Sequence, residues 1–214
     1  REDLEYMKSV KPDAVFDESR YEVKPIAEDK VPGLFSLRGI SDETVRELAS
    51  FLVLIRDRRN GKFDGYNIGF PYTDEHGDKV KGYEIRGHGS YKSKAAGTDS
   101  SASAWVADLS GGNREAVRNV FFCESALDAM AFYQMNRLRL NRDAALVSLG
   151  GTFSDRQITG VMARFPNARA FDCFDNDLAG RIYGLRMMAL LEGIPMKISK
   201  TENGLRVEAK GKSF

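Results

Sequence analysis

The 214-residue chain has few of the residues that build structural metal or disulfide sites, since it contains two cysteines, two histidines and one tryptophan. Cys123 and Cys173 each lie inside an apolar run, which favours buried reduced thiols in a cytoplasmic protein. The cysteines and histidines are widely scattered, so no zinc-ligand spacing is present. A zinc-ribbon or disulfide-stabilised domain is therefore excluded for this stretch of chain.

A dominant charge and long apolar runs are also lacking. The chain has 32 basic and 31 acidic residues, so any surface that attracts a polyanion must be local. No stretch approaches the roughly 20 apolar residues of a membrane-spanning helix, and no signal peptide opens the chain. The chain begins at Arg1 and stops at "VEAKGKSF" without an end signal. We interpret it as a fragment of a longer cytoplasmic protein.

The first half of the chain predicts an arm followed by a helix. Residues 1–33 are charged and show no sustained apolar period, which indicates an arm or linker with one short helix near Leu4–Met7. Residues 34–53 place Ser41 as an N-cap ahead of apolar side chains at helical spacing. We therefore expect the first folded subdomain to begin at residue 34.

A β-hairpin is expected next. Residues 66–87 contain two β-favouring runs around "DEHGD", in which Gly77 can supply the positive φ of a tight loop. Residues 88–104 are rich in glycine, serine and lysine and predict a mobile surface loop. Together they complete a small α+β subdomain that we place at residues 34–113.

The second half, residues 114–214, alternates strands and helices. Apolar runs predict strands at 119–124, 144–151, 168–175 and 195–200, and amphipathic runs predict helices at 125–138, 154–165 and 178–193. Nearly continuous apolar strands that alternate with helices are typical of a parallel sheet with helices on both faces. The expected fold class is therefore α/β, with a helix-sandwiched parallel sheet after the smaller subdomain.

Carboxylates stand where the predicted parallel strands end. Glu124 closes the first strand, and Asp175 and Asp177 lie at and just past the end of the third. Gly150 and Gly151 end the second strand, where a backbone or a phosphate can approach closely. Because open α/β sheets bind ligands at the carboxyl ends of their strands, we expect these groups to share one site.

Hard oxygen ligands of this kind suit Mg²⁺ or Mn²⁺, which keep several waters and bridge to phosphate oxygens. A lone Asp-x-Asp has another interpretation, a solvated turn. The combined order is more specific: an apolar strand with a terminal glutamate, an aspartate four residues on, a glycine-ended strand, and an apolar strand followed by Asp-x-Asp and Ala-Gly-Arg.

That order resembles the Toprim domain, which bacterial primases share with topoisomerases, nucleases and recombination-repair proteins. "FFCESALDAMA" resembles its strand-plus-glutamate motif, and "FDCFDNDLAGR" resembles the primase form of its Asp-x-Asp motif. "SLRGISDETVRELAS" and "IGFPYTDEHGDKVKGYEIRG" resemble the segment that precedes Toprim in bacterial primases. The likeness covers roughly residues 34 to 200 and is nearest to primase-like proteins of plasmids and conjugative elements.

The resemblance implies roles for four carboxylates. Glu124 would be a general acid/base or a metal ligand, Asp175 and Asp177 would hold Mg²⁺, and Asp128 would be an auxiliary ligand. All four would thus belong to one catalytic metal site. Asp128 is equally compatible with a solvent-facing helix residue.

A polyanionic partner also needs a local cationic track. Arg86, Lys92 and Lys94 fall at and after the hairpin, in the region that flanks the template groove in primases, and Tyr91 between them can stack on a base. Arg181 opens the helix after Asp-x-Asp and can neutralise the site or contact a phosphate. The alternatives are an ordinary solvated loop and a plain surface arginine.

The leading hypothesis is a primase-type nucleotidyltransferase of a mobile element that uses NTPs and single-stranded DNA, with a helicase or relaxase as a partner. One departure from primases stands against it. Asp64, Tyr66 and Asn67 occupy positions where primases carry basic residues before the hairpin. A catalytically decayed nucleic-acid-binding module of a mobilisation protein, or a Toprim nuclease, therefore remains as an alternative.

Overall fold

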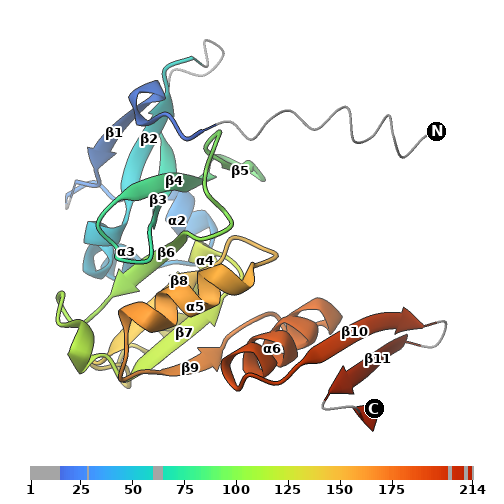
Figure 1. Ribbon diagram of the computed structural model, residues 1–214. Helices are drawn as coiled ribbons and strands as arrows, with labels where there is room; N and C mark the ends of the chain where they lie inside the picture. Colours follow the sequence, from blue (N-terminus) through green and yellow to red (C-terminus); the bar gives the residue numbers. More distant parts are fainter. Residues whose placement is uncertain (1–14, 28, 60–64, 202–203, 210–211, 214) are drawn as a thin grey trace, which may run out of the picture.

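The computed structural model describes residues 15–27, 29–59, 65–201, 204–209 and 212–213. Its central feature is one nine-stranded mixed sheet with the order β1-β2-β3-β6-β8-β7-β9, to which β4 and β5 are attached through β3 (Figure 1). A separate three-stranded sheet has the order β10-β11-β12. The small subdomain and the α/β half are therefore joined through a continuous sheet.

The strands are β1 (Tyr21–Pro25), β2 (Val53–Asp57), β3 (Asn67–Thr73), β4 (Val80–Arg86), β5 (Lys92–Lys94), β6 (Ala104–Asp108), β7 (Asn119–Cys123), β8 (Ala144–Ser148), β9 (Arg169–Asp172), β10 (Met196–Thr201), β11 (Gly204–Ala209) and β12 (Lys212–Ser213). The helices are α2 (Gly33–Leu37), α3 (Asp42–Glu47), α4 (Ala126–Asn136), α5 (Asp155–Arg164) and α6 (Leu178–Leu191), with 3₁₀ turns η1 (Glu18–Arg20), η2 (Ala49–Phe51) and η3 (Arg114–Ala116).

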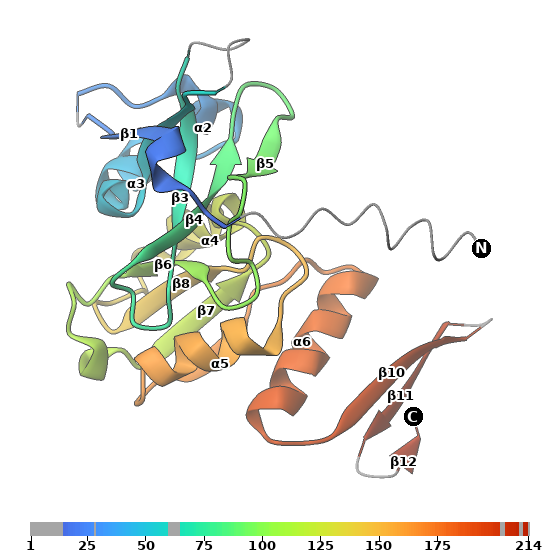
Figure 2. The same ribbon diagram turned by 45° about the horizontal axis from the view of Figure 1, so that its top comes forward.

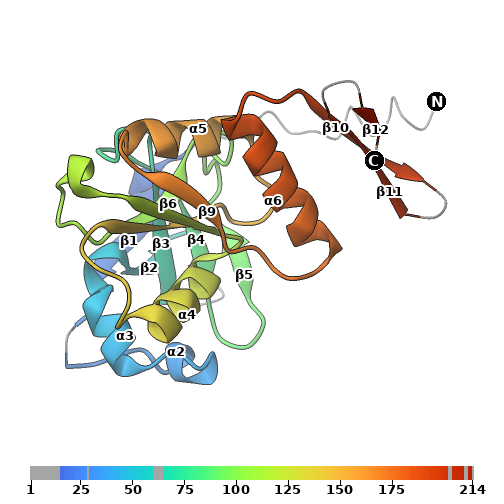
Figure 3. The ribbon, with the colours of Figure 1, turned by 90° about the horizontal axis from the view of Figure 1, so that it is seen from below.

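The predicted parallel core is confirmed. β8, β7 and β9 lie side by side and parallel, and α4 and α5 connect them. Figure 3 shows α2, α3 and α4 on one face of the sheet and α5 and α6 on the other. Two buried clusters fill these layers, one around Trp105, Phe70 and Met130 and the other around Phe122 and Phe165. The apolar strands are thus covered on both faces, as their sequence requires.

Local capping signals in the sequence also appear in the structure. Ser41 caps α3, and Ser154 forms a capping box with Gln157 at the start of α5. Gly193 follows α6 with φ of 64°. The predicted hairpin is formed by β3 and β4, with Gly77 at φ of 74° in the connection. These short-range hydrogen bonds need no tertiary partner, which explains why the sequence predicts them well.

Three expectations need correction. The fourth predicted strand does form as β10, but it pairs antiparallel with β11 and stands off the main sheet (Figure 2). Lys92–Lys94 lie in the expected mobile loop, yet they form β5 and pair with β4. Tyr21–Pro25, within the expected arm, pair antiparallel with β2. In each case the conformation depends on pairing with another strand, which local composition does not predict.

Two further predictions are not tested by the structure, and it also shows the environment of the two cysteines. The short helix near Leu4–Met7 lies outside the described residues, and the domain boundaries after residues 33 and 113 stay predictions. Cys123 is free and buried, and Cys173 is free and half-buried. In the part of the chain that the structure describes, no helix is both long and apolar enough to cross a membrane.

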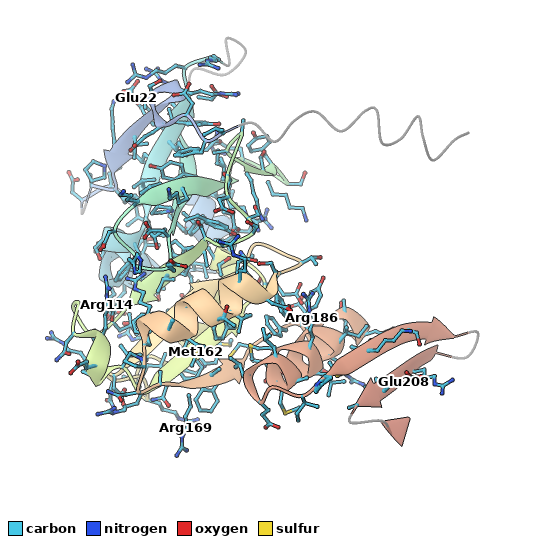
Figure 4. The ribbon with its side chains drawn as sticks, in the orientation of Figure 1. Glu22, Arg114, Met162, Arg169, Arg186 and Glu208 are labelled. Carbon is cyan, nitrogen blue, oxygen red and sulfur yellow. The ribbon has the colours of Figure 1, made fainter. Side chains whose placement is uncertain are left out.

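A charged cluster on β1 gives a stability prediction. Glu22 accepts hydrogen bonds from the Tyr66 hydroxyl and from Arg56, and it pairs with Lys24 at 3.2 Å. These bonds, that of Tyr66 first, lower the pKa of Glu22 from 4.5 to about 2. Figure 4 shows Glu22 in the N-terminal part of the molecule, far from Glu208 on β11.

Because the folded-state pKa of Glu22 is lowered, its stabilisation is complete above pH 4.5 and is lost as the pH falls toward 2. The Glu22→Gln variant should therefore melt at a lower temperature than the wild type at pH 7, with the difference vanishing near pH 2. Thermal unfolding followed by circular dichroism checks this. A difference that stays constant over this pH range would contradict it.

Candidate functional site

A cleft of about 650 Å³ lies at the carboxyl ends of β7 and β8. Its lining comes from both halves of the sequence: Arg38, Glu84, Arg86, Lys92, Ser93, Lys94, Glu124, Ser125, Leu127, Asp128, Ala131, Gly150, Gly151 and Asp175. Three of the four predicted carboxylates and three of the predicted basic residues are among them. The topological rule for open α/β sheets thus locates the cleft correctly.

The carboxylates enter the cleft from the ends of two parallel strands. Glu124 follows the last residue of β7, and Asp175 lies three residues past β9. The backbone N–H of Asp175 points at Glu124 Oε1, 3.4 Å away. Asp128, in the first turn of α4, accepts a hydrogen bond from the Ser125 hydroxyl at 2.5 Å. Glu124, Asp128 and Asp175 therefore share one wall.

The electrostatics of this wall disfavour a fully ionised set of carboxylates. Partial burial raises the pKa of Glu124, and the negative charges of Asp175, Asp177 and Asp128 raise it further. The hydrogen bond from the Asp175 N–H opposes this shift. A cation in the cleft would relieve the repulsion.

Asp177 has a structural task that the sequence motif does not reveal. Its Oδ1 accepts the backbone N–H of Gly180 at 2.8 Å, so it is the N-cap of α6. Asp177 is also absent from the lining of the cleft, although its charge acts on Glu124. One member of the Asp-x-Asp pair therefore lines the cleft, while the other starts the helix behind it.

The N-cap assignment predicts different results for two substitutions. Asp177→Ala should lower the free energy of unfolding by about 1 kcal/mol, because an orphan N–H of α6 loses its acceptor. Asp177→Asn should leave stability nearly unchanged, because asparagine caps equally well. Urea denaturation of both variants measures the difference. Equal stability losses in the two variants would argue that the charge, and not the cap, is what matters.

Basic residues also line the cleft. Arg86 ends β4, and Lys92 and Lys94 are the first and last residues of β5. Burial lowers the pKa of Lys94, and nearby Glu84 opposes that shift. A Cβ at Gly150 would stand 2.0 Å from the buried Tyr72 hydroxyl, and Gly150 has φ of 71°, so both the space and the backbone conformation favour glycine there.

Glu84 and Arg38 are cleft residues that the sequence interpretation missed. Glu84 is only 3% exposed, accepts two hydrogen bonds from Arg86 at 2.8 and 3.0 Å, and accepts one from the Ser148 hydroxyl. It therefore orients Arg86. Its position two residues before Arg86, on the same face of β4, is the signal that could have identified it. For Arg38, the signal that could have identified it as a cleft residue is the Arg-Gly pair at residues 38–39.

Two predicted nucleic-acid-binding residues lie outside the cleft. Tyr91 lines a neighbouring pocket that borders β5. Arg181, in the first turn of α6, reaches Asn176 Oδ1 at 3.2 Å and lines a different, apolar groove. The structure thus brings together Arg86, Lys92 and Lys94 in the cleft, places Tyr91 in a neighbouring pocket that Lys94 also lines, and places Arg181 in a separate groove.

The chemistry of the donor set fits a divalent cation bound with incomplete protein ligation. Within the described ranges, no group of three or more histidine, cysteine or acidic side chains is arranged to enclose a metal. Mg²⁺ commonly binds through one or two carboxylates and completes its shell with water and phosphate oxygens. Glu124 and Asp175 could supply those two carboxylates, and Asp128 lies on the same wall.

Comparison with known proteins adds a family match. Residues 121–205 match the family described as Toprim-like. No curated protein matches the chain. A solved structure of bacteriophage T7 lagging-strand DNA polymerase interacting with primase domains of two gp4 subunits, bound to an RNA/DNA hybrid and dTTP, is 15% identical and has a TM-score of 0.53; the match covers 82% of this chain and 79% of that chain.

Two further similar structures have lower TM-scores. The primase fragment of the bacteriophage T7 primase-helicase protein is 18% identical, with 82% of this chain and 64% of that chain covered and a TM-score of 0.49. The RNA polymerase domain of Mycobacterium tuberculosis primase DnaG, in complex with double-stranded DNA, is 19% identical, with coverages of 78% and 54% and a TM-score of 0.43. At these identities structural likeness bears on the fold alone.

Proposed function

We propose that the protein, whose residues 121–205 match the family described as Toprim-like, is a primase-like nucleotidyltransferase. It acts on single-stranded DNA with NTPs and Mg²⁺ or Mn²⁺, in the replication or transfer of a mobile element. A helicase or relaxase is the expected partner.

The observation that supports this proposal most directly is that carboxylates and basic side chains line the same cleft. Glu124, Asp128 and Asp175 line it together with Arg86, Lys92 and Lys94. Phosphoryl and nucleotidyl transfer depends mainly on positioning and on compensating phosphate charge, which such a set of side chains can provide.

Each residue has a chemical task in the proposed reaction. Arg86 and Lys92 bind the phosphates of the incoming nucleotide, and Glu84 holds the Arg86 guanidinium in place. Glu124 accepts the proton of the attacking hydroxyl at its carboxylate. A metal bound at Glu124 and Asp175 would supply electrostatic stabilisation of the phosphate undergoing displacement.

Primer synthesis tests the proposal. The full-length protein is incubated with a single-stranded template, NTPs and Mg²⁺, and the products are resolved on a denaturing gel. Short oligonucleotides that require both template and metal are expected. Failure to form any product while Mg²⁺ still binds would contradict nucleotidyl transfer. DNA cutting that needs metal but no NTP would instead identify a Toprim nuclease.

A second candidate, a nucleic-acid-binding module without catalysis, is favoured by two observations. The described residues contain no enclosed set of three metal-ligating side chains. In addition, Tyr66 and Asn67 stand before the hairpin in place of basic residues. Calorimetric titration with Mn²⁺ discriminates between the candidates, because only the catalytic one predicts binding that disappears in Asp175→Asn.

A further inference from the structure

A second pocket, of about 260 Å³, lies in the N-terminal half beside the cleft. Its walls come from β1, β2, β3, β4 and β5: Arg20, Tyr21, Ile55, Asp57, Asn67, Ile85, Tyr91, Ser93, Lys94, Ala95 and Ala96. Ligand pockets for drug-sized molecules measure roughly 300–1,000 Å³. This pocket is therefore sized for a single ring system rather than for a whole nucleotide.

The lining mixes apolar side chains with polar and charged ones, among them Arg20, Asp57 and Lys94. Ile55 and Ile85 are 1% and 7% exposed. The charges of Arg20 and Asp57 compensate each other through hydrogen bonds of 2.5, 2.9 and 3.0 Å. Lys94 reaches the Ser100 hydroxyl at 2.9 Å. A flat ring that carries hydrogen-bonding groups on its edge suits this mixed lining.

An amide and an aromatic ring are placed side by side at this pocket. Asn67 begins β3, one residue beyond the Ile68–Arg86 pair of the β3–β4 register. A Cβ at Gly87 would stand 2.4 Å from Asn67 Oδ1 and 2.9 Å from Tyr91 Cδ1. The absence of a side chain at Gly87 therefore lets both groups approach the same point.

Both groups are available for a ligand. The Tyr91 ring is 50% exposed, and the Gly87–Tyr91 turn is closed by the hydrogen bond from Gly87 N–H to the Tyr91 carbonyl at 3.0 Å. Among the described residues, none forms a hydrogen bond with the Asn67 amide. A carboxamide presents a donor and an acceptor in one plane, which matches the N6 and N7 edge of adenine. An exposed aromatic ring can stack on any base.

The pocket and the cleft share a wall. Ser93 and Lys94 line both of them, and Lys92 lies next in the chain within the cleft. A nucleotide lying across β5 can therefore place its base beside Asn67 and Tyr91 and its phosphates beside Lys92 and Arg86. The second pocket, of about 260 Å³, is too small to hold both the base and the phosphates of one nucleotide.

We propose that this second pocket, the base pocket, binds the base of a single nucleoside triphosphate, with adenine preferred, while the phosphates lie in the cleft. The inferred binding of the phosphates in the cleft rests on the proposed function. The inferred binding of the base rests on Asn67, Tyr91 and the pocket itself. Tyr91 stacks on the base, and Asn67 selects it.

Binding of ATP and of inorganic tripolyphosphate, measured calorimetrically with Mg²⁺ present, separates the two halves. Tyr91→Ala should weaken ATP binding by about 5- to 150-fold, the range expected for loss of one stacked base. Tripolyphosphate should bind the wild type and this variant equally. Tyr91→Phe keeps the ring and should retain ATP affinity. Asn67→Ala should reduce the preference for ATP over CTP and UTP.

The outcomes distinguish failure of the base pocket from failure of the proposed function. Equal effects of Tyr91→Ala on ATP and tripolyphosphate, or no effect on either, would overturn the base pocket alone. If the wild type binds neither molecule, the proposed function fails, and titration with adenosine then judges the pocket. Nuclear magnetic resonance shifts at Asn67 and Tyr91 on adding adenosine would support it, and their absence would overturn it.

Discussion

Glu124→Gln and Asp175→Asn are each expected to lower primer synthesis by on the order of 10²–10⁴-fold, which is the usual loss when an acid–base group is removed. Both substitutions keep the size of the side chain and remove its charge. Glu124 and Asp175 lie against each other in the cleft, and the negative charge of Asp175 helps to raise the pKa of Glu124. Their neutralisation removes both the proton acceptor and the carboxylates that would hold Mg²⁺.

Asp172→Asn is the matched control for these variants. Asp172 ends β9, three residues before Asp175, but it is exposed and does not line the cleft. Its neutralisation should leave primer synthesis and Mn²⁺ binding unchanged. Wild-type activity in both Glu124→Gln and Asp175→Asn would contradict the catalytic assignment, and equal losses in all three variants would point to a general charge effect.

Gly180→Ala should disrupt the site through the backbone. A Cβ at Gly180 would stand 1.9 Å from the carbonyl oxygen of Asp175 and 2.8 Å from its carbonyl carbon. Backbone atoms cannot rotate out of the way, so the loop that carries Asp175 must move. We expect a loss of about 1–3 kcal/mol in the free energy of unfolding and about 10²-fold in activity, because small displacements of catalytic groups are that costly.

Gly184→Ala, one turn further along α6, provides the control. The atoms nearest to its Cβ would belong to the Asp172 side chain, with Oδ2 at 2.2 Å, and that exposed side chain can rotate away. Stability should change by less than about 1 kcal/mol, since alanine also favours a helix over glycine. Urea denaturation and primer synthesis are measured on both variants. Similar results for Gly180→Ala and Gly184→Ala would contradict the backbone explanation.

Much of the α/β half follows from sequence periodicity. The apolar runs around Phe122, Leu146 and Phe171 form the three parallel strands, and Ser154 and Gly193 begin and end their helices as their residue types predict. Such features depend on neighbours within a few positions along the chain. The order of strands and helices then places Glu124 and Asp175 at one edge of the sheet, so the core of the candidate site was also predictable.

Side-chain roles at the site were less predictable. Asp175 and Asp177 look equivalent in the motif, yet Asp177 caps α6 while Asp175 lines the cleft. Tyr91 and Lys92 are adjacent in sequence, but Tyr91 lines the second pocket while Lys92 lines the cleft. Glu84 was missed, since its importance comes from burial against Arg86 and Ser148.

The sequence by itself determined the parallel α/β core, its helix caps and the convergence of Glu124 with Asp175. Each of these follows from local hydrogen bonding, periodicity and the fixed handedness of strand–helix–strand connections. Only the tertiary structure decided that β10 leaves the main sheet and that Arg86, Lys92 and Lys94 line the same cleft as the carboxylates. The physical reason is that pairing between distant strands, such as β3 with β6 and β6 with β8, sets these positions. That pairing depends on packing between distant segments, which local sequence patterns do not encode.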